Sequence, residues 1–103
     1  MRMFPIALAL ALFAGGLTAA HADQELLQKN NCFACHSIDK RKYGPTFVDV
    51  AKKYAGDSGA VADLARKIKA GGSGVWGEDP MPPQPQVSDA DALAIAKFVM
   101  SLK

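Results

Sequence analysis

Hydrophobic residues recur three and four positions apart in three segments of the chain, residues 46–54, 58–70 and 88–103. This spacing places them on one face of an α-helix, so each segment predicts an amphipathic helix. The apolar faces consist of Phe47, Val50, Ala51 and Tyr54; of Val61, Leu64, Ala65 and Ile68; and of Leu93, Ala96, Val99 and Met100, widened by Ile95, Phe98 and Leu102. A shorter helix is expected over residues 23–31, where two adjacent leucines supply the apolar residues.

Residues that start or stop helices delimit these segments. Thr46 and Ser88 are suited to N-caps, and aspartates at positions 89 and 91 favour the positive end of the last helix dipole. Between the helices, Gly44-Pro45 signals a loop, and four prolines within residues 80–85 exclude a helix or a central strand. No strand pattern is evident. The sequence therefore predicts an all-α domain of four to five short helices around long loops.

The first 22 residues differ from the rest of the chain. Arg2 precedes a nearly continuous apolar run over residues 4–17, and the small residues of an A-x-A site end at Ala22. A positive start, an apolar stretch and such a site are the three parts of a secretory signal peptide. We therefore expect cleavage after Ala22, which divides the chain into a signal peptide, residues 1–22, and one domain, residues 23–103.

An uncleaved membrane anchor is the alternative interpretation of this segment. Residues 3–22 contain no Asp, Glu, Lys or Arg, and a spanning helix needs about 20 residues. Breaks at Pro5, Gly15 and Gly16, together with the A-x-A site, favour cleavage. The mature domain is then exported to an oxidising compartment, without stable insertion in a membrane.

Cleavage leaves a small domain of nearly balanced charge. Arg2 is the only basic residue that is removed, so eleven basic residues remain beside ten acidic ones in 81 residues. This balance gives no basic excess for binding nucleic acid and no acidic tail. A domain of this size buries a marginal core and often depends on a disulfide, a metal or a cofactor for its stability.

The segment N-N-C-F-A-C-H holds both cysteines of the chain and the only histidine that remains after cleavage, namely Cys32, Cys35 and His36. A thioredoxin-like dithiol needs its C-x-x-C after a buried strand, whereas a helix is expected before Cys32. A structural zinc site needs four ligands, and Asp39 is the only further candidate nearby. A disulfide across so short a step closes a very small loop and removes little chain entropy.

Attachment of a haem uses all three residues, because C-x-x-C-H is the signature of c-type haem. Two cysteines about one helical turn apart can each add to a porphyrin vinyl group, and His36 can then bind the iron. A haem also supplies the apolar plate that so small a domain needs for its core. We interpret the motif as the site of one haem c, covalently bound through Cys32 and Cys35.

The chemistry of such a site depends on the sixth iron position, which is open in gas binders and filled by a strong ligand in electron carriers. His21 leaves with the signal peptide, so two methionines are the remaining candidates. Met100 belongs to the apolar face of the last helix, where methionine is an ordinary core residue. Met81 stands alone in a loop, where methionine is usually a surface residue or gap filler. Its proline neighbours stiffen the backbone, however, which favours Met81 as the sixth ligand.

Several motifs occur in order along the chain: C-F-A-C-H, Gly44-Pro45, G-S-G-V-W-G, D-P-M-P-P and an acid-capped last helix. Together they resemble the small bacterial class I cytochromes c, nearest the cytochrome c-551 (c8) type, over residues 23–103. The resemblance implies the class I cytochrome c fold, wrapped around one covalent haem with His36 and Met81 as the iron ligands. It also implies a monomeric periplasmic carrier rather than an enzyme. Such a carrier shuttles single electrons between respiratory partners, for example from the cytochrome bc1 complex to a nitrite reductase, oxidase or peroxidase.

The resemblance assigns roles to two further residues. Pro45 matches the proline whose carbonyl accepts the Nδ1–H bond of the ligand histidine. Trp76 matches the tryptophan whose indole N–H bonds a haem propionate. An ordinary Gly-Pro turn and a plain core aromatic are the alternatives for these two positions.

Three features depart from the family pattern. Lys67 stands where relatives often have an arginine near a propionate, and Arg66 lies beside it. The asparagine common near the methionine sulfur has no clear equivalent, and Gln84 is the candidate. Glu78 and Asp79 occupy positions that are often apolar, which changes the surface expected to face partners.

Two rival functions predict different behaviour. An exported thiol–disulfide enzyme that uses Cys32 and Cys35 is colourless and reacts with thiol reagents after reduction. A haem sensor or gas binder takes up carbon monoxide readily in its ferrous state, because its sixth position is open.

Overall fold

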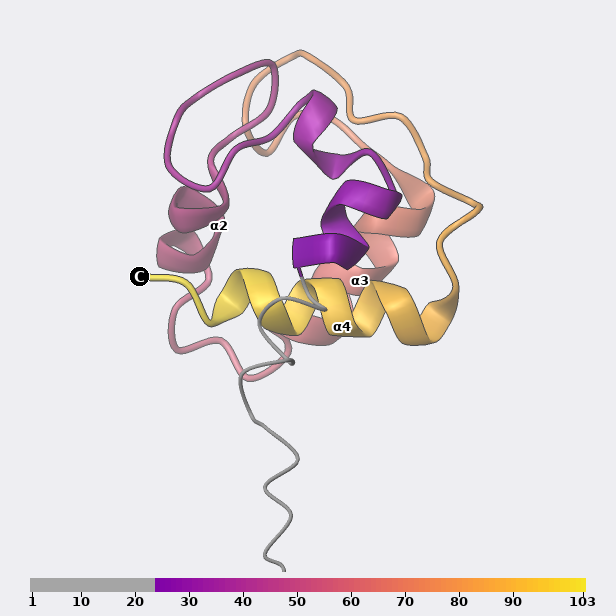
Figure 1. The fold of residues 1–103 in the computed structure, drawn as a ribbon. Coiled ribbons are helices and arrows are strands. Elements are labelled where there is room, and N and C mark those ends of the chain that lie inside the picture. The colour runs from indigo at the N-terminus through magenta and orange to yellow at the C-terminus, as the bar shows by residue number, and fades with distance from the viewer. Residues whose placement is uncertain (1–23) are drawn as a thin grey trace, which may run out of the picture.

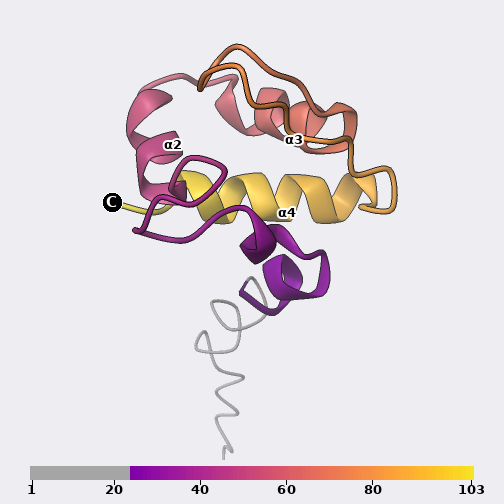
Figure 2. The same ribbon diagram turned by 90° about the horizontal axis from the view of Figure 1, so that it is seen from above.

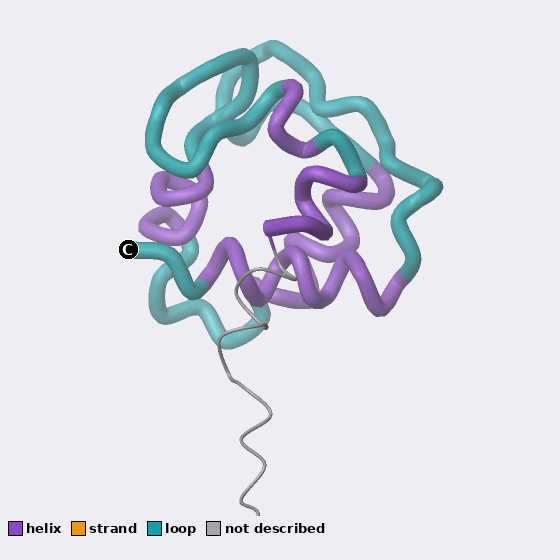
Figure 3. Tube along the Cα trace, in the orientation of Figure 1, coloured by secondary structure: helices purple, strands orange, loops and turns teal. Residues whose placement is uncertain are grey.

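The computed structural model describes residues 24–103, so the predicted signal peptide and its cleavage after Ala22 lie outside the described residues. Residues 24–29 form a first helical segment. It is followed by the 3₁₀ turn η1 (Cys32–Ala34) and the helices α2 (Phe47–Lys53), α3 (Ala60–Ala70) and α4 (Asp89–Met100) (Figure 1). Within this range the chain consists of helices and loops (Figure 3), with one isolated β-bridge between Gly72 and Met81. The prediction of an all-α domain with four to five short helices is confirmed.

The predicted caps of two helices are present. The Thr46 hydroxyl accepts a hydrogen bond from the backbone N–H of Asp49 at 3.0 Å and starts α2. The Ser88 hydroxyl accepts one from the N–H of Asp91 at 3.1 Å and starts α4. Each bond satisfies a backbone donor that has no partner within its own helix.

Other helix limits differ from those predicted. The first helix was expected to reach residue 31, but Asn31 has a φ of 60°, a left-handed conformation that asparagine tolerates, and the chain turns there into η1. Helix α3 starts at Ala60 rather than at residue 58, because the Asp57 carboxylate accepts the N–H of Gly59 at 2.9 Å and holds a turn ahead of it. Helix α4 ends at Met100 rather than at residue 103.

Helix α4 forms the centre of the core and packs against both α3 and α2. Figure 2 shows it crossing the molecule, with α3 on one side and the segment of residues 24–34 on the other. The buried cluster comprises Leu27, Phe47, Val50, Ala65, Val87, Ala92, Ile95, Ala96 and Val99. Every described helical segment except the short η1 turn thus contributes to one hydrophobic core.

The buried face of α4 is rotated from the predicted one. Leu93 was expected to face the core, but its side chain is 42 % exposed, whereas Ala92 is 1 % exposed. Both residues fit a helical repeat with Ala96 and Val99, so periodicity cannot separate them. Packing selects the stripe with two alanines, whose small side chains let α4 approach its neighbours closely.

Two long loops, residues 35–46 and 71–88, complete the ring that the backbone forms in Figures 1 and 3. The first loop runs from η1 to α2, and the second runs from α3 to α4. Among residues 24–103, none of the helices has both the length and the apolar content needed to span a membrane.

Candidate functional site

A cavity of about 280 Å³ opens between the helices and the two loops. Its walls come from η1, all three longer helices and both loops, and most of its lining is apolar. All six site residues predicted from the sequence line it: Cys32, Cys35, His36, Pro45, Trp76 and Met81. Residues that lie far apart in the sequence therefore meet at a single site.

The two cysteines lie at the η1 wall of this cavity. Both are half-buried, and they are not joined in a disulfide. Burial raises the pKa of the Cys32 thiol above its usual value, and a backbone hydrogen bond offsets the shift only in part. A redox-active dithiol needs a nucleophilic cysteine whose pKa is lowered. The shift at Cys32 is opposite in direction to the one that such a dithiol needs.

His36 follows the turn directly and is held on two sides. Its Nδ1 lies 2.8 Å from the carbonyl oxygen of Pro45, the hydrogen bond that was expected from the sequence. Its ring stacks on Phe47, with the ring centroids 4.9 Å apart and an angle of 24° between the planes. When Nδ1 carries the proton and donates to Pro45, the lone pair of Nε2 is left to bind a metal.

Gly44 allows the loop to pass this close to the imidazole. A Cβ atom at this position would lie 2.6 Å from Cε1 and 2.8 Å from Nδ1 of His36. The N–H of Gly44 also donates to the carbonyl of Cys35 at 2.7 Å, which ties the loop to the motif. Glycine is therefore required here by close contact with the histidine.

Met81 enters the cavity wall from the second loop. Its backbone pairs with Gly72 through two hydrogen bonds, at 2.7 Å and 3.0 Å, which form the isolated bridge. Gly71, with a φ of 70°, ends α3 beneath this loop, and a Cβ there would lie 2.4 Å from the carbonyl oxygen of Met81. The end of α3 and the bridge together fix where the Met81 side chain starts.

Gln84, the candidate neighbour of the methionine sulfur, also lines the cavity. Its backbone N–H donates to the carbonyls of Ile68 and Lys69 at the end of α3. Its side-chain amide donates to the carbonyl of Pro82 at 3.1 Å and accepts a bond from Gln86 at 2.7 Å. These contacts anchor the loop after Met81 onto α3.

One part of the cavity wall is basic and aromatic. Lys67 lines the cavity, and its ammonium donates to the Tyr54 hydroxyl at 3.1 Å. Arg66 instead points outward, with 72 % of its side chain exposed, and pairs with Asp63. The ammonium of Lys53 lies 5.4 Å from the centre of the Trp76 ring. Of the two basic residues considered from the sequence, the structure thus places Lys67 at the site.

Some cavity residues were missed as site residues in the sequence. Tyr54 and Phe47 were assigned only to an apolar helix face, although both line the cavity. Tyr43 lies in a polar loop without periodicity, and no local signal marks it.

These groups suit a flat, largely apolar prosthetic group with an acidic edge. Two thiols and an imidazole share one wall, a thioether comes from another loop, and an ammonium and an indole supply donors. Within residues 24–103, no group of three or more His, Cys, Asp or Glu side chains has an arrangement that could hold a metal ion, as a zinc site requires. The chemistry of the cavity fits a covalent haem.

Comparison with known proteins agrees with this reading of the cavity. The family model for cytochrome c matches residues 22–103. The chain belongs to the cytochrome c family. Its family resemblance, predicted from the motifs, is confirmed.

Individual cytochromes c match over nearly their whole lengths. Cytochrome c-552 of Nitrosomonas europaea is 50 % identical over 95 residues, which cover 92 % of this chain and 90 % of that protein. Cytochrome c-551 of Pseudomonas aeruginosa is 50 % identical over 105 residues, which cover 98 % and 100 %. The crystal structure of wild-type N. europaea cytochrome c552 matches with a TM-score of 0.76 at 51 % identity, over 78 % of this chain and 99 % of that one.

The cytochrome c family assignment fixes the fold, the cofactor and the general role. The fold is the small class I cytochrome c fold. The cofactor is one haem c, bound covalently through the C-x-x-C-H motif that contains Cys32 and Cys35. The protein is a monohaem carrier in electron transfer.

Proposed function

We propose that this cytochrome c is a soluble periplasmic carrier that shuttles single electrons through an iron ligated by His36 and Met81. One observation carries the proposal. His36 and Met81 line the same cavity from separate loops, with Nδ1 of His36 engaged by Pro45 so that Nε2 is left for a metal. A bound haem iron supplies one-electron chemistry by alternating between its ferric and ferrous states.

The residues around the cavity suit an electron carrier better than a gas binder. The Met81 thioether would occupy the iron position left open by His36, and this ligation would disfavour external ligands and raise the iron potential relative to two nitrogen ligands. The Pro45 carbonyl fixes the orientation of the His36 ring and increases the basicity of its free nitrogen. Trp76 and Lys67 provide an N–H donor and a positive charge for the propionates. No bond of a substrate is made or broken, so the protein acts as a carrier and not as an enzyme.

Export supports the periplasmic part of the proposal. Residues 1–22 have the composition of a signal peptide, and its removal would leave the mature domain, residues 23–103, without this apolar segment. The mature domain has nearly balanced charge, and we propose that it acts as a monomer, without nucleic acid and without stable membrane insertion. Its predicted partners are redox proteins, such as the cytochrome bc1 complex as donor and a nitrite reductase, oxidase or peroxidase as acceptor.

Transient electron-transfer complexes use small contact areas, which permit fast exchange. Basic residues cluster near the C-x-x-C-H turn, where Lys40, Arg41 and Lys42 are exposed and the ammonium of Lys42 donates to the carbonyl of Phe33 at 3.0 Å. The opposite loop exposes two carboxylates, Glu78 and Asp79. A partner face with separated acidic and basic groups would be steered to this side of the molecule.

The ligand assignment is tested by absorption spectra of the purified protein in both redox states. The wild-type protein should show sharp ferrous c-type bands and, when oxidised, a weak far-red band from sulfur bound to iron. Met81→Ala should lose the far-red band and lower the reduction potential by about 0.1 V or more. Met100→Ala is the matched control, since Met100 lies on α4 away from the cavity lining, and it should keep both.

The rival functions give distinct outcomes in the same preparation. Colourless protein with two reactive thiols would indicate the thiol–disulfide enzyme. Coloured wild-type protein that binds carbon monoxide readily when ferrous would indicate the gas binder. A far-red band that persists in Met81→Ala would show that Met81 is not the iron ligand.

A further inference from the structure

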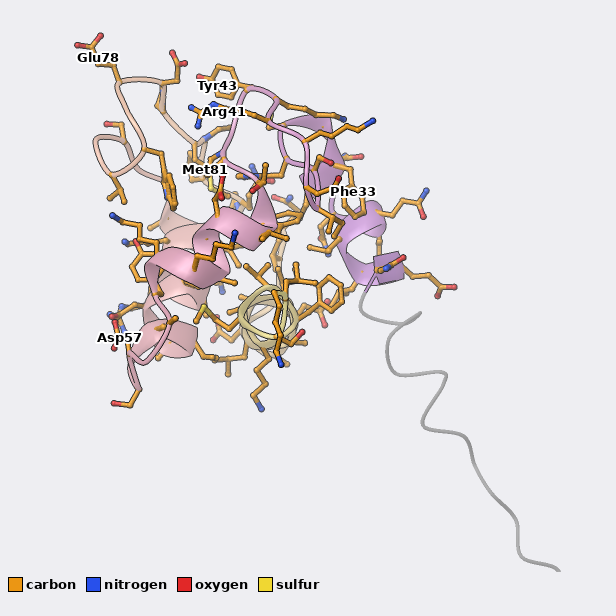
Figure 4. All side chains as sticks on the ribbon, turned by 90° about the vertical axis from the view of Figure 1, so that its left-hand side faces the viewer. Phe33, Arg41, Tyr43, Asp57, Glu78 and Met81 are labelled. Carbon is orange, nitrogen blue, oxygen red and sulfur yellow. The ribbon has the colours of Figure 1, made fainter. Side chains whose placement is uncertain are left out.

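Tyr43 combines exposure with a position at the cavity. Its side chain is 49 % exposed, yet it lines the cavity from the loop that precedes α2. Its hydroxyl donates a hydrogen bond to the carbonyl oxygen of Pro80 at 3.1 Å, across 37 positions of sequence. In Figure 4 Tyr43 lies on the same side of the molecule as Glu78, above Met81. The bond therefore joins the two loops at the edge of the cavity.

Each end of this bond adjoins one of the two proposed iron ligands. Tyr43 precedes Gly44 and Pro45, which bond the carbonyl of Cys35 and the Nδ1 of His36. On the other side, Pro80 directly precedes Met81. The Tyr43–Pro80 hydrogen bond is thus a short mechanical connection between the segment that holds His36 and the segment that holds Met81.

The same bond also restrains the peptide group between Pro80 and Met81 at its second polar atom. The Pro80–Met81 peptide donates its N–H to Gly72 at 2.7 Å and accepts the Tyr43 hydroxyl at its carbonyl. Without the hydroxyl, this peptide would be held from the Gly72 side alone. The neighbouring residues 77–80 are all exposed, so little other packing restrains the loop there.

We propose that Tyr43 is a positioning residue that keeps the loop of residues 77–83 closed and thereby keeps Met81 at the sixth position of the iron. This inference rests on the proposed His36 and Met81 ligation. An external ligand binds the iron only when Met81 has left, so its apparent affinity rises with the open fraction of this loop. A neutral hydrogen bond of this kind shifts an equilibrium by about two- to tenfold.

The test uses the holoprotein of wild type and of Tyr43→Phe, which keeps the ring and removes the hydroxyl. Ferric protein is titrated with imidazole, and loss of the far-red band reports displacement of Met81. We expect Tyr43→Phe to bind imidazole about two- to tenfold more tightly than wild type. The midpoint of global unfolding, followed by far-UV circular dichroism, should stay close to that of wild type, because the exposed bond fixes one loop only.

Lys42→Met is the matched control. Lys42 is the exposed neighbour of Tyr43 and also donates one side-chain hydrogen bond to a backbone carbonyl at 3.0 Å, but to Phe33 on its own side of the cavity. This variant should bind imidazole as wild type does.

Each remaining outcome overturns a defined part of the inference. Equal imidazole affinity in Tyr43→Phe and wild type, both with the far-red band, refutes the role of Tyr43 and leaves the ligand assignment intact. A tighter affinity accompanied by a proportional loss of global stability, or matched by Lys42→Met, shows general loosening instead of positioning. A wild-type protein without the far-red band refutes Met81 as ligand and the inference with it.

Discussion

The wall of the cavity that carries His36 and the wall that carries Met81 are held in different ways. Four consecutive residues after Tyr43, residues 44–47, are buried. Backbone hydrogen bonds tie this segment to its own neighbourhood: Gly44 bonds Cys35, Phe47 bonds Ser37 and Val48 bonds Ile38. The histidine ring is clamped in addition by Pro45 and Phe47.

The Met81 wall is an exposed loop with few anchors. Most residues between positions 72 and 86 are exposed, and Met81 itself is half-buried. The anchors include the bridge to Gly72, the bonds from Gln84 to the end of α3 and the Tyr43 hydroxyl. The Trp76 side chain also packs against the core cluster. A segment with few buried contacts opens at lower free energy than a packed one. The difference implies that the two proposed ligands are unequal, with His36 fixed by the fold and Met81 held by a small number of bonds.

Removal of both cysteine attachments should have the largest effect on stability, because it removes the haem that the His36 wall and the Met81 wall both contact. In the variant Cys32→Ala/Cys35→Ala we expect little haem and loss of most helical circular dichroism. The cost is the whole stability of a domain of this size, about 5 kcal/mol or more. Each single variant keeps one cysteine and should retain haem and most of its helix. A colourless double variant with native helix content would mean that the domain folds without bound haem.

Substitution of Gly44 tests the rigid wall. In Gly44→Ala the new Cβ would meet the clamped His36 ring at 2.6 Å, and neither the ring nor the buried loop can yield. We expect the free energy of unfolding to fall by about 2–3 kcal/mol, measured by chemical denaturation. Gly59→Ala is the control, since its Cβ would lie 3.5 Å from the nearest atom, and it should unfold as wild type does. A harmless Gly44→Ala would show that the His36 wall is also pliable.

Substitution of Gly71 tests the looser wall and should have the smallest effect on global stability. In Gly71→Ala the Cβ would meet the carbonyl of Met81 at 2.4 Å, but the exposed loop can move away. We expect a loss of about 1–3 kcal/mol, because alanine at Gly71 would have to adopt a φ of 70° and a ψ of −168°, together with a weakened far-red band. Gly56→Ala is the control, since it has a φ of 82° with open space around it.

Gly56→Ala should lose stability through the strain of its positive φ and should keep an unchanged far-red band. If Gly71→Ala costs more than Gly44→Ala and keeps its band, the order of rigidity between the two walls is reversed.

Local patterns predicted those parts of the protein that depend on neighbouring residues. Helices α2 and α4, with their caps at Thr46 and Ser88, follow from periodicity and side chains within one turn. The C-x-x-C-H motif indicated the haem c because its three functional groups are adjacent in sequence. The start of α3 differs from the predicted residue 58 because the Asp57 carboxylate accepts the N–H of Gly59 and holds a turn ahead of the helix.

Parts that depend on packing between distant segments could not be predicted in the same way. Ala92 and Leu93 each have helical spacing to Ala96, so periodicity does not decide which of them is buried. Packing of α4 against its neighbours buries Ala92. Arg66 and Lys67 are adjacent basic residues, and the direction of α3 alone turns Lys67 to the cavity. Tyr43 had no local signal because its partner lies 37 positions away.

The sequence by itself determined the chemistry of the protein, namely the thiols, the imidazole and the thioether, and the helices that local capping and periodicity specify. The tertiary structure decided how these groups are held. It buries the loop before α2 against the core, leaves the loop after α3 in solvent, and joins the two through Tyr43 and Pro80. The physical reason is that hydrogen bonding within one turn is encoded by adjacent residues, whereas burial and contacts between loops arise only when the whole chain closes around its cavity.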